Sequence, residues 1–166
     1  MIAILLNDAS FEQDIRELLM AFYPGETFTH KEEEAGDADL IVRGVRDGNS
    51  FSLDVTPVKK EAVHFALIYP DFSNRFETKN EIKQTLYRLL SAQTGRELPW
   101  GTLTGIRPTK IALTKLYDGW TDEQIETYMR ETYFTSKEKI DLSIDVAERE
   151  RRLLSTIDYE NGYSLY

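Results

Sequence analysis

A turn signal between two apolar runs restricts the fold of this chain more than any other feature. Leu40 to Val45 and Phe51 to Val55 are separated by Arg46-Asp47-Gly48-Asn49. The second run alternates apolar and polar residues as a half-buried strand does, and an Asp-Gly pair supplies the positive φ that a tight turn needs. The pattern predicts an antiparallel hairpin, with a third strand over Val63 to Tyr69.

Helical patterns lie on both sides of these strands. Ile2 to Leu6 predicts a buried strand, and the segment after it carries apolar residues on one helical face, with Ser10 and Gln13 forming a capping box. Further helices are expected over Thr78 to Thr94, ended by Gly95, and over Pro108 to Tyr117. Two more should begin at the caps Thr121–Gln124 and Thr135–Glu138.

This order of elements predicts an α+β fold: a small, mostly antiparallel sheet with packed helices, followed by a helical subdomain. We expect an α/β lobe over residues 1–98 and a helical subdomain over residues 99–158. Residues 159–166 resemble the first residues of another strand. The 41% hydrophobic and 30% charged fractions are typical of a globular protein.

Composition excludes several functions. The chain has no cysteine, which excludes disulfides, thiolate nucleophiles and thiolate-ligated zinc or iron–sulfur clusters. A net charge of −9 argues against nucleic-acid and anionic-membrane partners. No apolar run approaches the roughly 18 residues of a membrane-crossing helix, and the N-terminus lacks the basic flank of a signal peptide. We therefore expect a cytoplasmic location.

The chain shows no recognisable catalytic or metal-binding motif. His30 and His64 are the two histidines, and neither has a second metal ligand at helical spacing. No Gly-x-Ser-x-Gly nucleophile motif is present. We assign no catalytic residue and no metal ligand, and we expect both histidines to be structural or exposed.

The unusual segment runs from Trp100 to Lys110, with two glycines and two cations beside the start of a helix. Free N–H groups and the dipole at a helix N-terminus favour an anion. One interpretation is a carboxylate- or phosphate-binding corner built from Thr104, Gly105, Arg107 and Lys110. The alternative is a hinge that packs Trp100 and Ile106 between the lobes, with Arg107 capping carbonyls or pairing with an acid.

The same segment carries a family resemblance. Leu98-Pro-Trp-Gly-Thr-Leu-Thr-Gly-Ile-Arg-Pro-Thr-Lys-Ile111 resembles the signature ahead of the catalytic domain in HemZ-type oxygen-independent coproporphyrinogen III oxidases. These bacterial radical S-adenosylmethionine proteins are also called coproporphyrinogen dehydrogenases. The resemblance is strong over Leu86 to Lys110 and over the tail Gly162 to Tyr166, and weak over the first 80 residues.

The resemblance implies a role in porphyrin (haem) biosynthesis as the N-terminal accessory or substrate-side domain of a radical oxidoreductase. In that family the tail leads into a radical domain, in which three cysteines hold a 4Fe–4S cluster that binds S-adenosylmethionine. Those cysteines are absent here, so no catalytic position is carried over. The implied partners are the protein's own C-terminal radical domain and a porphyrinogen. That Arg107 and Lys110 contact the carboxylates of such a substrate is a hypothesis from the anion corner and not a rule of the family. The alternatives are a partner-recruiting or regulatory module and a small free-standing enzyme that uses carboxylates.

Overall fold

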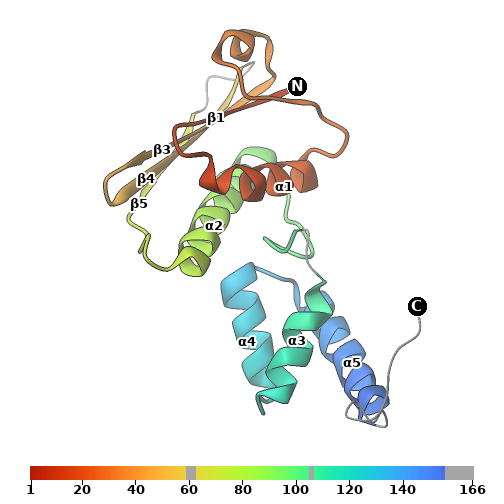
Figure 1. The fold of residues 1–166 in the computed structure, drawn as a ribbon. Coiled ribbons are helices and arrows are strands. Elements are labelled where there is room, and N and C mark those ends of the chain that lie inside the picture. The colour runs from red at the N-terminus through yellow and green to blue at the C-terminus, as the bar shows by residue number, and fades with distance from the viewer. Residues whose placement is uncertain (59–62, 105–106, 156–166) are drawn as a thin grey trace, which may run out of the picture.

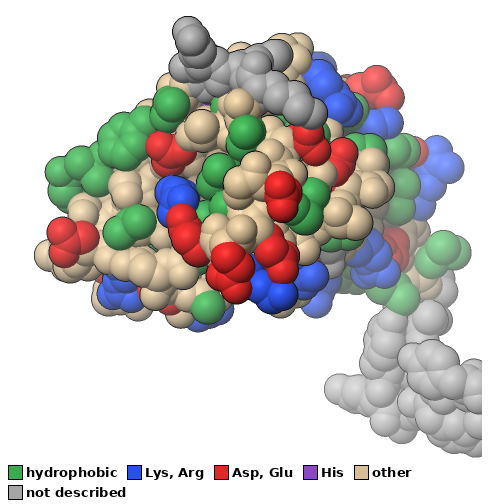
Figure 2. Space-filling view, turned by 90° about the horizontal axis from the view of Figure 1, so that it is seen from above, with side chains coloured by type: hydrophobic (Ala, Val, Ile, Leu, Met, Phe, Trp, Pro, Cys, Tyr) green, Lys and Arg blue, Asp and Glu red, His purple; other side chains and the backbone are tan. Residues whose placement is uncertain are grey.

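The computed structural model describes residues 1–58, 63–104 and 107–155. Figure 1 shows a twisted sheet, two helices that cover one of its faces, and three further helices on the far side of those two. The predicted α+β class is confirmed. Figure 2 views the molecule from above Figure 1 and shows acidic and basic side chains interspersed on that face.

The sheet has five strands in the order β2-β1-β3-β4-β5. β1 runs parallel to β2 and β3, whereas β3, β4 and β5 are antiparallel neighbours. The antiparallel part matches the prediction, and the parallel β1 makes one side of the sheet mixed. The strands are β1 (Ile2–Leu6), β2 (Phe28–Thr29), β3 (Leu40–Asp47), β4 (Ser50–Pro57) and β5 (His64–Ile68).

The predicted hairpin forms, with its turn one residue later than the Asp-Gly pair would place it. Asp47 still pairs with Ser50 across the ladder, so Gly48 and Asn49 are the two turn residues. Gly48 has a φ of 56°, which suits a tight hairpin turn with glycine in its first position. The two strands are therefore longer than their apolar residues indicate.

Two helices pack on the sheet and enclose the main core. They are α1 (Glu12–Phe22) and α2 (Arg75–Thr94), and α2 ends at Gly95, which caps it with a φ of 68°. The predicted apolar stripe of α1 is buried as expected. With its counterpart on α2 and the inner face of the sheet it forms one cluster, which includes Phe11, Ile15, Leu18, Leu19, Phe22, Phe51, Leu53, Ile82, Leu86 and Leu90.

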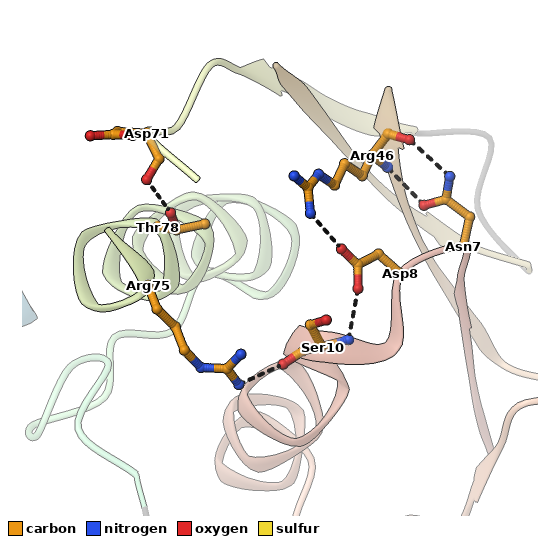
Figure 3. Close-up of polar contacts among 7 residues, drawn as sticks. All are labelled: Asn7, Asp8, Ser10, Arg46, Asp71, Arg75 and Thr78. Carbon is orange, nitrogen blue, oxygen red and sulfur yellow. Dashed lines mark hydrogen bonds and ion pairs between the residues drawn. The ribbon is translucent and has the colours of Figure 1, made fainter. Parts of the chain in front are cut away.

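The start of α1 is fixed by a polar cluster, shown in Figure 3. The Asp8 carboxylate accepts a hydrogen bond from the Ser10 backbone N–H at 2.9 Å and an ion pair from Arg46 at 3.1 Å. Arg75 of α2 donates to the Ser10 carbonyl oxygen at 3.2 Å. The predicted Ser10–Gln13 capping box is wrong, because a short 3-10 turn, Ala9–Phe11, begins at Asp8 and precedes the helix.

Three helices follow and form a second core. They are α3 (Pro108–Tyr117), α4 (Asp122–Tyr133) and α5 (Lys137–Leu154). The Thr121–Gln124 capping box is confirmed, whereas Thr135 does not cap α5, which begins after Ser136. Within the described ranges, no helix is both long and apolar enough to cross a bilayer. The buried residues of this core are Ala112, Leu113, Leu116, Ile125, Met129, Ile140, Ile144 and Ala147.

The two cores meet at the C-terminal end of α4. The Gln84 side-chain amide on α2 donates to the carbonyl oxygen of Thr132 at 2.8 Å. Phe134 ends α4 with a φ of 57°, and its ring lies 5.5 Å from that of Tyr87 and under the guanidinium of Arg88. The boundary at residue 99 stays a prediction, and the expected strand over 159–166 lies outside the described residues.

Residues 98–104, which we call the strap, are joined by backbone hydrogen bonds to the end of α4 and the start of α5. The Thr102 N–H donates to the carbonyl oxygen of Tyr133 at 2.7 Å, and the Ser136 N–H donates to the carbonyl oxygen of Pro99 at 2.9 Å. Gly101 has a φ of 58°, and a Cβ at this position would lie 1.9 Å from the Tyr133 oxygen. The segment that carries the family resemblance therefore contains a glycine that the packing requires.

Candidate functional site

A cleft of about 550 Å³ lies between α1, α2 and the strap. Its volume is in the range of small-molecule sites, which is roughly 300–1,000 Å³. Ionisable groups dominate its lining: Asp14 and Glu17 from α1, and Arg75, Lys79 and Lys83 from α2. The remaining lining residues include Phe76, Leu103, Thr104 and Tyr133.

Helical spacing explains why these groups face one another. Arg75, Lys79 and Lys83 are four residues apart on α2, so they project from one side of the helix. Asp14 and Glu17 are three residues apart on α1 and are likewise neighbours. Because α1 packs beside α2, the acidic side of one helix meets the basic side of the other.

Lys83 is the unusual member of this group, since its side chain is buried and the residue is 5% exposed. Its ammonium donates to the Thr104 hydroxyl oxygen at 2.7 Å, and that hydroxyl donates to the Glu17 carboxylate at 3.2 Å. Gln13 donates to the other Glu17 oxygen at 3.1 Å. The neutral Thr104 hydroxyl therefore lies between the buried ammonium of Lys83 and the carboxylate of Glu17.

Burial lowers the pKa of Lys83 below its ordinary value, because desolvation disfavours the charged form. The charge of Lys79 acts in the same direction, whereas the charges of Asp14 and Glu17 oppose the shift. A buried ionisable group with a perturbed pKa in a cleft is a physical indicator of a functional site. Lys83 thus marks this cleft as the candidate site.

The cleft carries a net positive charge although the chain is acidic. Lys79 forms an ion pair with Asp14 at 2.6 Å, and Asp14 is nearly buried. Three cations against two carboxylates leave a net charge of +1 in the cleft, within a chain of net charge −9. The net charge of the cleft therefore favours binding of an anion, whereas the net charge of the whole chain does not.

The residues of the predicted anion corner are placed differently from one another. Thr104 lines the cleft and contacts Lys83. Gly105 lies outside the described residues. Arg107 precedes α3, is 60% exposed in its side chain and forms an ion pair with Glu150 at 3.3 Å, as the hinge alternative expected. Lys110 is exposed, and neither cation lines the cleft. Anion binding by this corner stays a prediction.

Sequence reasoning missed Lys83, although a signal was present. Lys83 immediately follows Ile82 and stands three residues before Leu86, both of which are fully buried. A cation so close to the apolar stripe of a helix is expected to be partly or fully shielded from water. Its hydroxyl partner Thr104 is 21 residues away, and no local pattern brings the two together.

The two histidines lie outside the cleft. His30 lies 3.4 Å from the Glu12 carboxylate and is half-exposed, and His64 begins β5 at the edge of the sheet. Among the described residues, no group of three or more His, Cys, Asp or Glu side chains is placed to hold a metal ion. Because the chain has no cysteine, it offers no thiolates for the iron–sulfur cluster that the resemblance implies for longer relatives.

The fold and the cleft define a small α+β domain with a buried cation in a polar cleft, tied to a three-helix unit by the strap. This chain is 27% identical over 150 residues to the oxygen-independent coproporphyrinogen-III oxidase-like protein HemZ of Bacillus subtilis strain 168. The match covers 87% of this chain and 30% of that protein, and it confirms the resemblance found in the sequence. No protein-family model and no solved structure matches.

Proposed function

We propose that this chain is the substrate-side accessory part of a coproporphyrinogen oxidase-like oxidoreductase of porphyrin biosynthesis. The observation that carries the proposal is the similarity to the HemZ protein over 150 residues. The chain spans less than a third of that relative, so the activity of a whole protein of this kind requires residues beyond the aligned segment. The absence of cysteine supports the same division of labour, since the thiolate ligands of a radical-generating cluster would have to come from elsewhere.

The part assigned to this chain is recognition of carboxylates. A coproporphyrinogen carries four propionate groups, and a cation removed from water binds a carboxylate more strongly than an exposed one does. The net positive cleft around Lys83 supports this role. The chemistry of the cluster and of S-adenosylmethionine would belong to a separate radical domain.

The test is a titration of the chain with coproporphyrin III, the stable oxidised form of the substrate class. Binding is measured as quenching of the fluorescence of Trp100 and Trp120. We expect saturable binding that weakens as salt is added, because the contacts are ionic. The tetramethyl ester of the same porphyrin is the matched control, and it should bind at least tenfold more weakly. Equal binding of acid and ester, or no binding of the acid, would contradict the proposal.

One observation favours the alternative of a partner-recruiting module. β5 is one of the two edge strands of the sheet, and Phe65 and Leu67 on it are exposed, as is Tyr69 directly beyond it. An apolar edge strand is a surface on which another chain can add a strand. Replacing Phe65 and Leu67 by lysine separates the two candidates, because porphyrin binding should not change if the cleft is the binding site.

A further inference from the structure

The buried ammonium of Lys83 has unused capacity to bind an anion. An ammonium has three N–H donors, and the Thr104 hydroxyl accepts one of them. In the part of the chain that the structure describes, no carboxylate lies within ion-pair distance of the Lys83 nitrogen. Burial of a charge without an opposite charge is costly, and a bound carboxylate would offset that cost.

Two apolar side chains also line the same cleft. Phe76 lines the cleft and is 54% exposed, and the half-buried Leu103 lies on the strap across from it. Phe76 is seven residues before Lys83 on α2, which places it about 10 Å away along the helix axis. The cleft therefore presents a cation in its interior and an aromatic ring near solvent.

We propose that this cleft binds one carboxylate arm of an organic acid whose remaining body is apolar and flat. The carboxylate accepts hydrogen bonds from the two remaining N–H groups of the Lys83 ammonium, which the Thr104 hydroxyl holds in place through the third, and the apolar body lies against Phe76 and Leu103. The assignment rests on the proposed function only in taking a porphyrin propionate as one such arm.

The charge balance of the cleft supports a single carboxylate. Lys79 is already neutralised by Asp14, and Glu17 is held by Thr104 and Gln13. The excess is one positive charge, so one carboxylate makes the lining neutral, whereas a second would leave an uncompensated anion.

The experiment uses 2-naphthoate as the aromatic monocarboxylate and its methyl ester as the neutral control, with binding measured by calorimetry. Lys83→Met keeps the length of the side chain and removes its charge, so we expect naphthoate affinity to fall at least tenfold. Thr104→Val and Phe76→Ala should each weaken naphthoate severalfold. Lys31→Met is the matched control, because it removes an exposed lysine outside the cleft, and it should leave affinity unchanged.

The results separate this inference from the proposed function. Equal binding of naphthoate to the wild type and to Lys83→Met, or of the ester and the acid, would overturn the inference. Coproporphyrin III that binds Lys83→Met as tightly as the wild type would overturn the cleft assignment and leave the proposed function standing. Lys83-dependent binding of naphthoate without any binding of coproporphyrin III would support the cleft and contradict the proposed function. Should Lys83→Met not fold, unchanged binding by Thr104→Val and Phe76→Ala would overturn the inference.

Discussion

At the scale of single residues, Lys83 shows how a site can conflict with stability. Its ammonium is withdrawn from water, and its bond to the neutral Thr104 hydroxyl offsets only part of that cost. Asp14 and Glu17 of α1, Arg75 and Lys79 of α2, and Tyr133 of α4 are the ionisable groups that line the cleft with it. An apolar side chain of similar length would fill the same space without the desolvation cost.

We therefore predict that Lys83→Met stabilises the folded chain, by about 1 kcal/mol or more. The folded-state pKa of Lys83 is lowered from 10.5, so the unfolded chain binds more protons between the two values. The wild type should gain stability as pH rises through that window, and the variant should lack this gain. Urea unfolding at pH 7 and pH 10 measures both effects, and a variant less stable than the wild type at pH 7 would contradict the prediction.

Asp8 has two roles that substitutions can separate. Asp8→Ala removes the acceptor for the Ser10 N–H and should cost about 1 kcal/mol of unfolding free energy. Asp8→Asn keeps that acceptor and loses only the ion pair with Arg46, so it should cost less. The hydrogen bond from the Ser10 side chain is the largest reason that the pKa of Asp8 is lowered, and the Ser10 backbone N–H acts in the same direction, so the stability that Asp8 contributes is lost as pH falls through its folded-state pKa. Urea unfolding of both variants at pH 7 and pH 3 tests the order.

At the scale of elements, the sequence predicted what local chemistry controls and missed what distant contacts control. The strand Ile2–Leu6, the helix from Pro108 and the Thr121 cap follow from patterns of a few residues, and all are present. β2 is two residues long, so it has no alternation to detect, and it pairs with β1 across a whole helix. The predicted Ser10 cap is wrong because Asp8, two residues earlier, caps the 3-10 turn that precedes α1.

Gly101 gives an element-scale prediction. A Cβ there would lie 1.9 Å from the Tyr133 carbonyl oxygen, so Gly101→Ala should break the contact between the strap and α4 and cost more than about 2 kcal/mol. Gly95→Ala is the matched control, because Gly95 has a φ of 68° and no atom within 4 Å of its added Cβ. It should show only the cost of the left-handed backbone, about 1 kcal/mol. Thermal unfolding compares the two, and equal losses would refute the role of the close approach.

At the scale of the whole molecule, four distant segments make the cleft, and Tyr133 of α4 is one of them. Residues 13–17, 75–83 and 102–104 meet only because α1 and α2 pack side by side and the strap bends back toward them. Periodicity predicted each helix, but no sequence pattern specified which sides would face each other. Of the predicted anion corner, Thr104 lies in the cleft and contacts Lys83, whereas Arg107 forms an ion pair with Glu150.

The two separate cores predict that the chain unfolds in parts. Ile125→Ala removes a fully buried side chain from the three-helix core and should cost about 2–5 kcal/mol there. Hydrogen exchange should then speed up across α3, α4 and α5, while the amides of β1, β3 and β4 keep their protection. Leu86→Ala, in the sheet core, is the reciprocal control. Equal acceleration in both parts would show a single cooperative unit.

Tyr133 belongs to the cleft and to the three-helix unit at once. Tyr133 lines the cleft, and its carbonyl oxygen accepts a hydrogen bond from the Thr102 N–H, two residues from the Thr104 hydroxyl that Lys83 contacts. α4 has twelve residues and is therefore about 18 Å long, and its C-terminal end lies at the cleft. A neighbouring domain that displaced the N-terminal end of α4 would shift the strap and change the solvation of Lys83 without contacting the cleft.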